Sequence, residues 1–254
     1  VRLCATPEDA RAHAAELLAM RSNVRGQANS GAILCEEYID APEFSVETFA
    51  WNGQIVCVGI TQKHVSKPPF FVELGHVFPA DLSEADARQI EETTRAALEL
   101  LGNRNGPIHT EIKLTPRGCV IIEINPRLAG GMIPELVAQS TGIDLLTNQL
   151  LAASGVAPQL EPRRQAYAGI VFLTAPSAGV FGGVPQLDAL RAQPGVVQAV
   201  VTKAVGQQVQ PAHSAYDRLG YVILTAEDRA TLAERLQQMR QQLEITVEPI
   251  PAQA

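Results

Sequence analysis

Alternating apolar and polar positions predict a first half rich in β-strands. Residues 44–51 and 55–60 are rich in apolar and aromatic residues and flank Asn52-Gly53, the dipeptide most typical of a tight β-hairpin turn. Three further extended segments are expected at residues 32–39, 109–114 and 119–124. The hairpin makes at least one antiparallel pair of strands in this half.

Helical spacing of apolar residues marks the other elements of this half. Thr6 followed by Pro7 has the pattern of a helix start, and Ser83 with Asp86 resembles a capping box before a second helix. Helical spacing returns across residues 133–151. Irregular segments rich in turn-forming residues are expected at residues 22–31 and 64–79, the second as a long connection.

A change of composition near residue 157 predicts a boundary between two parts of the chain. The segment 157–164 contains two prolines and a cluster of charged residues. After it the pattern indicates short strands and a final amphipathic helix capped by Thr225 and Asp228. The strands are expected at residues 168–173, 196–204 and 221–225. We therefore expect two domains, residues 1–156 and residues 157–254, the second a small α+β unit.

Composition and charge exclude several classes of protein. The chain has 254 residues and a net charge of −7, and its basic residues form no patch, so nucleic acid is not an expected partner. The mean hydropathy is +0.04, and no apolar run is long enough to cross a membrane. The four cysteines lack C-x-x-C spacing and lie beside apolar residues, which predicts buried thiols and a cytoplasmic location.

Carboxylates on two neighbouring predicted strands form the first candidate site. Glu123 and Asn125 lie two residues apart and share one strand face, and Arg127 continues the row. Glu111 precedes Glu123 by twelve residues, and a turn near residues 116–118 brings the two together. Like charges repel at that distance, and a hard divalent ion such as Mg²⁺ resolves the repulsion with oxygen ligands. The alternative is an ordinary solvent-facing strand edge.

A second acidic cluster precedes the predicted hairpin. Its members are Glu36, Glu37, Tyr38, Ile39 and Glu43. The backbone of this stretch can pair with the edge of a base, while the last carboxylate can accept hydrogen bonds from ribose hydroxyls. A solvated acidic loop is the alternative interpretation.

Taken together and in this order, the two clusters resemble the ATP-grasp superfamily of ligases. Residues 36–47 are similar to the hinge that holds adenine, and Glu111 with the sequence Glu-Ile-Asn-Pro-Arg at residues 123–127 is similar to the family's metal-binding strands. Residues 73–79 and 127–134 resemble the L-amino-acid (dipeptide) ligases. The resemblance covers about residues 1–155, and residues 179–183 and 217–221 resemble the small closing domain of such enzymes.

The resemblance implies both a fold and an activity. The fold is α+β, an ATP-grasp antiparallel sheet core with flanking helices followed by a small C-terminal closing domain. The activity is ATP-dependent joining of a carboxylate and an amine through an acyl phosphate, with release of ADP and phosphate and with Mg²⁺ or Mn²⁺ as the metal. The implied partners are small molecules, an amino acid carboxylate and an amine, and a homodimer is an expected assembly.

The resemblance also implies a role for each site residue. The metal would be held by Glu111, Glu123 and Asn125. The nucleotide would be bound by Glu36, Glu37, Tyr38, Ile39, Glu43 and Lys63. The substrates would be bound and activated by Arg127, Glu73, His76, Gly130 and Gly131. Blander alternatives stay open for two of these, a hydrogen-bonded structural histidine at His76 and a solvated loop lysine at Lys63.

Two other functions stay open on the sequence. One is a bicarbonate-using carboxylase or carbamoyl-type enzyme of the same superfamily, and the other is a non-catalytic fragment that binds ATP. The family carries an upstream domain, a phosphate-binding lysine and a glycine-rich loop, and Val1 lies just after the position of that loop. We therefore expect the C-terminal portion of a longer ligase, or a chain that acts with another polypeptide, and do not expect full activity from this portion alone.

Overall fold

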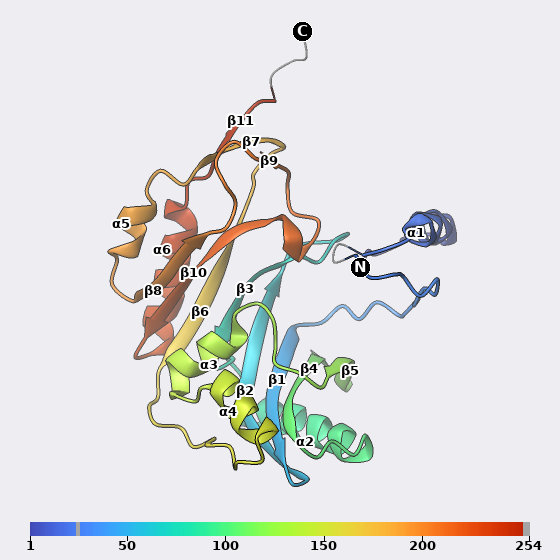
Figure 1. Cartoon of the computed structure of the whole chain (residues 1–254), viewed down its shortest axis with the longest axis vertical. Coiled ribbons are helices and arrows are strands. Elements are labelled where there is room, and N and C mark those ends of the chain that lie inside the picture. The colour runs from blue at the N-terminus through green and yellow to red at the C-terminus, as the bar shows by residue number, and fades with distance from the viewer. Residues whose placement is uncertain (24–25, 251–254) are drawn as a thin grey trace.

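One antiparallel sheet of eight strands forms the centre of the computed structural model, which describes residues 1–23 and 26–250 (Figure 1). In order across the sheet, its strands are β5 (Gly118–Asn125), β4 (Gly106–Thr115), β1 (Glu43–Trp51), β2 (Gln54–Val65), β3 (Glu73–Phe78), β6 (Tyr167–Thr174), β10 (Arg218–Ala226) and β8 (Val196–Val201). A smaller sheet has the order β11 (Thr246–Glu248), β7 (Gly179–Gly183) and β9 (Gln208–Val209). The predicted α+β class with an antiparallel core is confirmed.

The hairpin predicted at Asn52-Gly53 is confirmed. Trp51 of β1 pairs with Gln54 of β2, and the two turn residues have φ angles of 51° and 84°. Two consecutive residues with positive φ are what a type I′ turn requires, and the twist of that turn matches antiparallel strands. The turn therefore sets the register between the two strands that carry Glu43 and Lys63.

The long connection predicted at residues 64–79 is wrong over half of its length. β2 continues to Val65 and β3 begins at Glu73, so only the segment between them is a connection. β3 lies between β2 and β6 and pairs with both, with His76 opposite Lys63. Pro68, Pro69 and Gly75 disfavour a strand locally, but hydrogen bonding to a neighbouring strand on each side stabilises β3. Glu73 and His76 therefore lie on a sheet strand and not on a loop.

The strand predicted at residues 32–39 is absent. The segment is largely exposed, and no strand of the described residues pairs with it. A strand needs partners for its backbone N–H and C=O groups, which side-chain propensity cannot supply. The neighbouring loop predicted at residues 22–31 includes residues 24–25, which lie outside the described residues.

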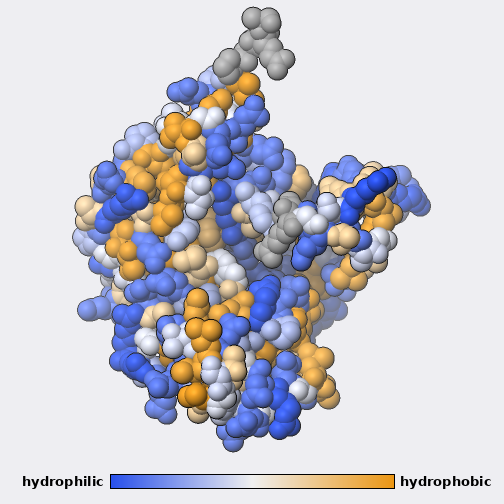
Figure 2. All heavy atoms as spheres, in the orientation of Figure 1, coloured by the Kyte–Doolittle hydropathy of each residue, from blue (hydrophilic) through white to orange (hydrophobic). Residues whose placement is uncertain are grey.

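Two predicted helix starts are confirmed, and the helices differ in packing. The side chain of Thr6 accepts a hydrogen bond at the start of α1 (Pro7–Ala19), and that of Ser83 does so at the start of α2 (Glu84–Leu100). α2 covers the sheet and buries Ile90 and Leu98, whereas α1 buries no residue. α1 projects from the body (Figure 1), and apolar atoms are exposed on this arm (Figure 2).

The helical spacing at residues 133–151 forms two helices. α3 (Ile133–Thr141) ends at Gly142, whose φ of 77° is the left-handed conformation that glycine adopts without strain. α4 (Leu145–Ala153) begins after Asp144, whose side chain accepts a hydrogen bond from the backbone N–H of Thr147. α3 packs against β3 and β6, close to the strands that carry the candidate site.

The strands predicted after residue 167 are confirmed as β6, β8 and β10. The last predicted helix is α6 (Arg229–Gln242), but its N-cap is Asp228, because Thr225 still belongs to β10. Two short helical segments complete this part, α5 (Leu187–Arg191) and the 3₁₀ turn η1 (Ala215–Asp217).

The eight-stranded sheet continues across the predicted domain boundary at residue 157. β3 pairs with β6, and one buried cluster combines Phe49, Phe78 and Leu136 from the first part with Ile170 and Ile223 from the second. The division into residues 1–156 and 157–254 stays a prediction. In the structure the two parts share a sheet and a core cluster.

The prediction of buried thiols is wrong. Cys35 is exposed and Cys4, Cys57 and Cys119 are half-buried. An apolar neighbour in sequence does not bury a residue. Cys57 and Cys119 lie on strands, where adjacent positions face opposite sides of the sheet, and Cys4 and Cys35 lie outside the helices and strands. Within the described ranges, none of the helices has the length and apolar character that crossing a bilayer requires.

Candidate active site around Lys63

Three predicted site residues from separate strands meet at the ammonium group of Lys63. Its Nζ lies 2.7 Å from Glu43 Oε1, 2.8 Å from Glu111 Oε1 and 3.0 Å from Glu73 Oε1. The lysine side chain is only 3% exposed, so it is not the solvated loop lysine of the alternative interpretation. The structure thus brings together residues that the sequence assigns to nucleotide, metal and substrate.

Strand order and one irregularity produce this meeting. β4, β1, β2 and β3 are neighbours in that order, with Ser45 of β1 opposite Glu111 of β4. On β3, Glu73 and His76 are three residues apart and would face opposite sides of a regular strand. The register between β2 and β3 shifts next to Val65, and this bulge allows Glu73 to reach Lys63 on the side where His76 also lies.

The charges of this cluster stabilise one another. Burial would lower the pKa of Lys63, but Glu111, Glu73 and Glu43 outweigh it and raise that pKa, so the ammonium group stays protonated. Burial would likewise raise the pKa values of Glu73 and Glu111. Lys63, His76 and Arg218 lower the pKa of Glu73 to about 2, and His109 and Lys63 lower that of Glu111 to about 2. These two carboxylates are therefore ionised at neutral pH.

A buried histidine that the sequence did not single out lies beside the predicted metal ligand. His109 Nδ1 lies 3.0 Å from Glu47 Oε1, and its Nε2 lies 3.3 Å from Glu111 Oε1. Ser45 donates to the same Glu47 oxygen at 2.7 Å. Burial would lower the pKa of His109, but the hydrogen bonds to Glu111 and Glu47 raise it to about 9. The period-two spacing of His109 and Glu111 was the one available signal.

The predicted metal ligands lie on paired positions. Glu111 is directly opposite Glu123, and His109 is opposite Asn125, whose Nδ2 is buried without a hydrogen-bond partner in the described structure. No group of three or more His, Cys, Asp or Glu side chains in the described ranges is arranged to hold a metal. Two carboxylates and an amide oxygen nevertheless suit Mg²⁺, which needs few protein ligands and completes its octahedron with phosphate oxygens and water.

His76 is fully buried and unpaired. Neither ring nitrogen has a hydrogen-bond partner among the described residues, and the nearest carboxylate oxygen, Glu73 Oε2, is 3.8 Å away. Burial lowers the pKa of His76 to about 3, so the ring is neutral at pH 7. A Cβ on Gly131 would lie 2.6 Å from Nε2 of this ring. The hydrogen-bonded structural histidine of the alternative interpretation is therefore not observed, and Gly131 must stay small.

Arg127 does not continue the row of Glu123 and Asn125. β5 ends at Asn125, and Arg127 lies in the following bend with its backbone N–H bonded to the Asn125 carbonyl. Its side chain is exposed and donates to the Leu128 carbonyl at 2.9 Å. Pro126 has no N–H for the ladder, so the strand and its alternation stop there. The role of Arg127, like that of the exposed Gly130, stays a prediction.

The predicted adenine segment is exposed and is tied to the cluster by a lysine. Glu36, Glu37 and Tyr38 are exposed, and the carbonyl of Ile39 accepts a hydrogen bond from Lys113 Nζ at 2.9 Å. The same ammonium group lies 3.7 Å from Glu43 Oε2. This contact holds the segment next to the carboxylate predicted to bind ribose.

An arginine from the C-terminal part also enters the site. Arg218 Nη2 donates to Glu73 Oε2 at 2.8 Å and to the Glu73 carbonyl at 2.9 Å. Its guanidinium carbon lies 3.7 Å above the ring of Phe172. The sequence signal was limited to the resemblance of residues 217–221 to a closing domain, which named no role for this side chain.

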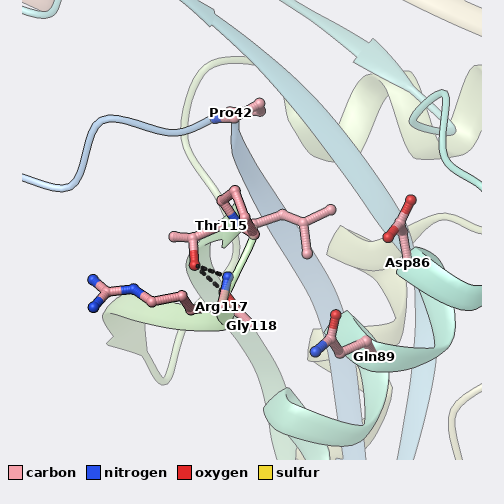
Figure 3. A pocket seen from close by; sticks show the side chains of 8 residues that line it. Pro42, Asp86, Gln89, Thr115, Arg117 and Gly118 are labelled. Atoms are coloured by element: carbon pink, nitrogen blue, oxygen red, sulfur yellow. Dashed lines mark hydrogen bonds between the residues drawn. The ribbon is translucent and has the colours of Figure 1, made fainter.

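A surface hollow lies outside this cluster. It is bounded by Pro42, by Asp86 and Gln89 of α2, and by the β4–β5 turn, where the Thr115 hydroxyl donates to the Gly118 carbonyl (Figure 3). None of the predicted site residues lines it. The charged cluster therefore lies on the sheet and not in this hollow.

Comparison with known proteins identifies the family to which the two parts of the chain are similar. Residues 1–135, more than half of the chain, match the family model of the ATP-grasp domain, and residues 171–248 match L-amino acid ligase C-terminal domain 2. The crystal structure of an L-amino acid ligase from Bacillus licheniformis superposes with a TM-score of 0.75 at 25% identity, over 83% of this chain and 53% of that chain.

Curated relatives extend the match along the chain. The protein y4rH of Sinorhizobium fredii is 28% identical over 249 residues, which are 98% of this chain and 51% of that protein. Carnosine synthase 1 of Gallus gallus is 28% identical over 186 residues, 69% of this chain and 20% of that enzyme. The chain thus spans about half or less of these relatives. Because the ATP-grasp model covers more than half of its residues, the chain belongs to the ATP-grasp family, and its C-terminal part matches that of the L-amino acid ligases.

Proposed function

We propose that this chain is part of an ATP-dependent carboxylate–amine ligase that forms an amide or peptide bond. The observation that carries the proposal is the convergence of Glu43, Glu73 and Glu111 on Lys63. One buried ammonium group thereby connects the residues assigned to the ribose, to a substrate amino group and to the metal. The relatives named as an L-amino acid ligase and carnosine synthase 1 support the same reaction class.

The residues of the site suit activation of a carboxylate by ATP. Enzymes of the ATP-grasp family use ATP with Mg²⁺, and the ion neutralises negative charge on the phosphates. In the proposal, Glu111, Glu123 and Asn125 hold the ion, residues 36–39 pair with adenine and Glu43 accepts from ribose hydroxyls. A substrate carboxylate oxygen attacks the terminal phosphorus of ATP, the bond to the leaving ADP breaks, and an acyl phosphate forms.

The second half of the reaction joins the amine. The neutral amine attacks the acyl carbon, the carbon–oxygen bond to phosphate breaks, and inorganic phosphate leaves with the proton that the nitrogen gives up. Arg127 neutralises the developing oxyanion with its planar donors, and Glu73 receives the amino group. The neutral His76 ring offers one donor and one acceptor to the reacting groups. Gly130 and Gly131 allow the backbone to approach a substrate closely.

The proposal also includes the assembly and the substrates. The substrates are small molecules, an amino acid carboxylate and an amine. A homodimer is proposed as the assembly, in line with the biotin carboxylase domain of a Hydrogenobacter thermophilus enzyme described as a dimer, which shares the fold.

The proposal is tested by product analysis. This chain, and the longest reading frame that contains it, are incubated with ATP, MgCl₂ and pooled amino acids, and released phosphate and amide products are measured by mass spectrometry. We expect the longer protein to form an amide product, and Glu123→Ala should abolish it. Glu92→Ala, at an exposed position of α2, is the matched control and should keep the activity. Phosphate release only with bicarbonate, or no release at all, would refute the ligase.

A further inference from the structure

Each carboxylate oxygen of Glu73 contacts a different cation. Its Oε1 contacts Lys63 at 3.0 Å, and its Oε2 accepts from Arg218 at 2.8 Å. The same Arg218 nitrogen also donates to the Glu73 backbone carbonyl at 2.9 Å. One donor group that binds both the backbone and the carboxylate of a residue fixes the torsion angles between them. Arg218 therefore determines the direction of the Glu73 carboxylate.

The contact between Arg218 and Glu73 crosses an intervening strand. β10 and β3 are not neighbours, because β6 lies between them. Arg218 begins β10 and lies over the ring of Phe172 of β6, with the guanidinium carbon 3.7 Å from the ring centroid. The same ring packs edge-on against His76 of β3, with 5.4 Å between centroids. Phe172 thus contacts both Arg218 and His76, while Arg218 itself contacts Glu73.

Three buried polar atoms beside this ring have no partner in the described structure. They are both ring nitrogens of His76 and Nε of Arg218. Buried polar groups in folded proteins are nearly always hydrogen-bonded, and an exception is a candidate for function. A charged guanidinium that is only 13% exposed and incompletely bonded is not placed there for stability alone.

We propose that Arg218 is a positioning residue of the substrate site, through which the C-terminal part of the chain directs Glu73 toward the amino group of a substrate. The inference rests on the proposed function, in which Glu73 receives that amino group. It adds a side chain from beyond residue 157 to a site otherwise built by the first part. The class of ligand that it affects is a small molecule with a primary ammonium group.

The first test needs no catalysis. The titration of Glu73 is followed by carbon NMR of its carboxyl group in the chain as it is and in Arg218→Met, Arg218→Lys and Arg229→Gln. Arg229 is the matched control, because it also belongs to the C-terminal part and donates to backbone carbonyls just after β3, at Pro79 and Ala80. We expect the pKa of Glu73 to rise in Arg218→Met, to rise less in Arg218→Lys and to stay unchanged in Arg229→Gln. An unchanged pKa in Arg218→Met would overturn the proposal.

The second test measures the substrate. In the ligase assay, Arg218→Met should raise KM for the amino substrate by about 10-fold or more, leave KM for ATP within about twofold, and be partly rescued by Arg218→Lys. Arg229→Gln should change neither KM. Equal changes in both KM values, or the same change in Arg229→Gln, would show a merely structural role. If the unsubstituted protein forms no amide, the proposed function fails, whereas the NMR result still decides whether Arg218 holds Glu73.

Discussion

Lys63 is the residue on which the charge balance of the site depends. Its side chain is 3% exposed and contacts three carboxylates. Removing one partner of a buried ion pair leaves the other partner's charge uncompensated, which costs more than the pair contributes as a whole. Loss of the lysine would therefore leave three carboxylates without their shared cation, and this should lower the stability of the fold.

Replacing Lys63 with Met should destabilise the chain by about 3–5 kcal/mol at pH 7. Lys67→Met, at an exposed position of the next segment, is the control and should change the free energy of unfolding by less than about 0.5 kcal/mol. Glu73 and Glu111 have folded-state pKa values near 2 against ordinary values of 4.5, so the cost should shrink as the pH falls through that window. Urea unfolding checks both points, and equal effects of the two substitutions would contradict the charge balance described.

His76 should make the chain less stable in mild acid. Its folded-state pKa of about 3 lies below the ordinary value of 6.5, so between these values the unfolded chain binds the extra proton. Stability is therefore fully present above pH 6.5 and falls below it, by up to about 1.4 kcal/mol per pH unit from this group. His76→Leu should reduce that slope in urea unfolding measured from pH 7 to pH 4. Parallel slopes for the two proteins would show that the ring is not buried in its neutral form.

At the scale of elements, capping and packing are separate properties. α1 and α2 both begin at predicted caps, yet α2 buries apolar side chains against the sheet and α1 buries none. A cap depends on residues within one turn, whereas burial depends on what the helix meets. The sequence could therefore predict where the helices begin but not which of them contributes to the core.

The same substitution in the two helices should have different effects. Leu98→Ala in α2 removes a fully buried side chain and should cost about 2–5 kcal/mol. Leu17→Ala in α1, where the residue is 37% exposed, should cost less than about 0.5 kcal/mol. Thermal and urea unfolding of both variants measure the contrast. A large loss in Leu17→Ala would mean that α1 packs against the body in solution.

On the scale of the whole molecule, the β3–β6 pair joins the two predicted domains. Residues from both sides of position 157 form one buried cluster behind it. Elements that share a sheet and a core usually unfold together. The change of composition near residue 157 is therefore a feature of the sequence, and the sheet continues across it.

A destabilising substitution in residues 157–254 should accordingly lower the unfolding midpoint of residues 1–156 as well. Ile223→Ala in β10 removes a fully buried side chain of the shared cluster and should lower stability by about 2–5 kcal/mol. Fluorescence of Trp51, the single tryptophan, reports on β1 and should show the lowered midpoint. Hydrogen exchange of the β10 amides, measured at increasing urea concentration, should give the same unfolding midpoint. An unchanged Trp51 transition would show that residues 1–156 and 157–254 unfold as independent domains.

The features that the sequence by itself determined are local ones. The hairpin at Asn52-Gly53, the caps at Thr6 and Ser83, and the pairing of Glu111 with Glu123 across a short turn all involve residues within about a dozen positions. Turn geometry, capping and strand alternation operate at that range, so the side-chain pattern is sufficient evidence for them. The second cluster at residues 36–43 depended further on its resemblance to a known family.

The pairing of strands that are distant in sequence could be seen only in the folded chain. The tertiary structure converted residues 73–78 from an expected connection into β3, and its bulge brought Glu73 to Lys63. It also placed Arg218 against Glu73 across 145 residues, and His109 against Glu47 across 62. Such contacts depend on strand order and register, which follow from the packing of the whole sheet and leave no periodic signal in the residues themselves.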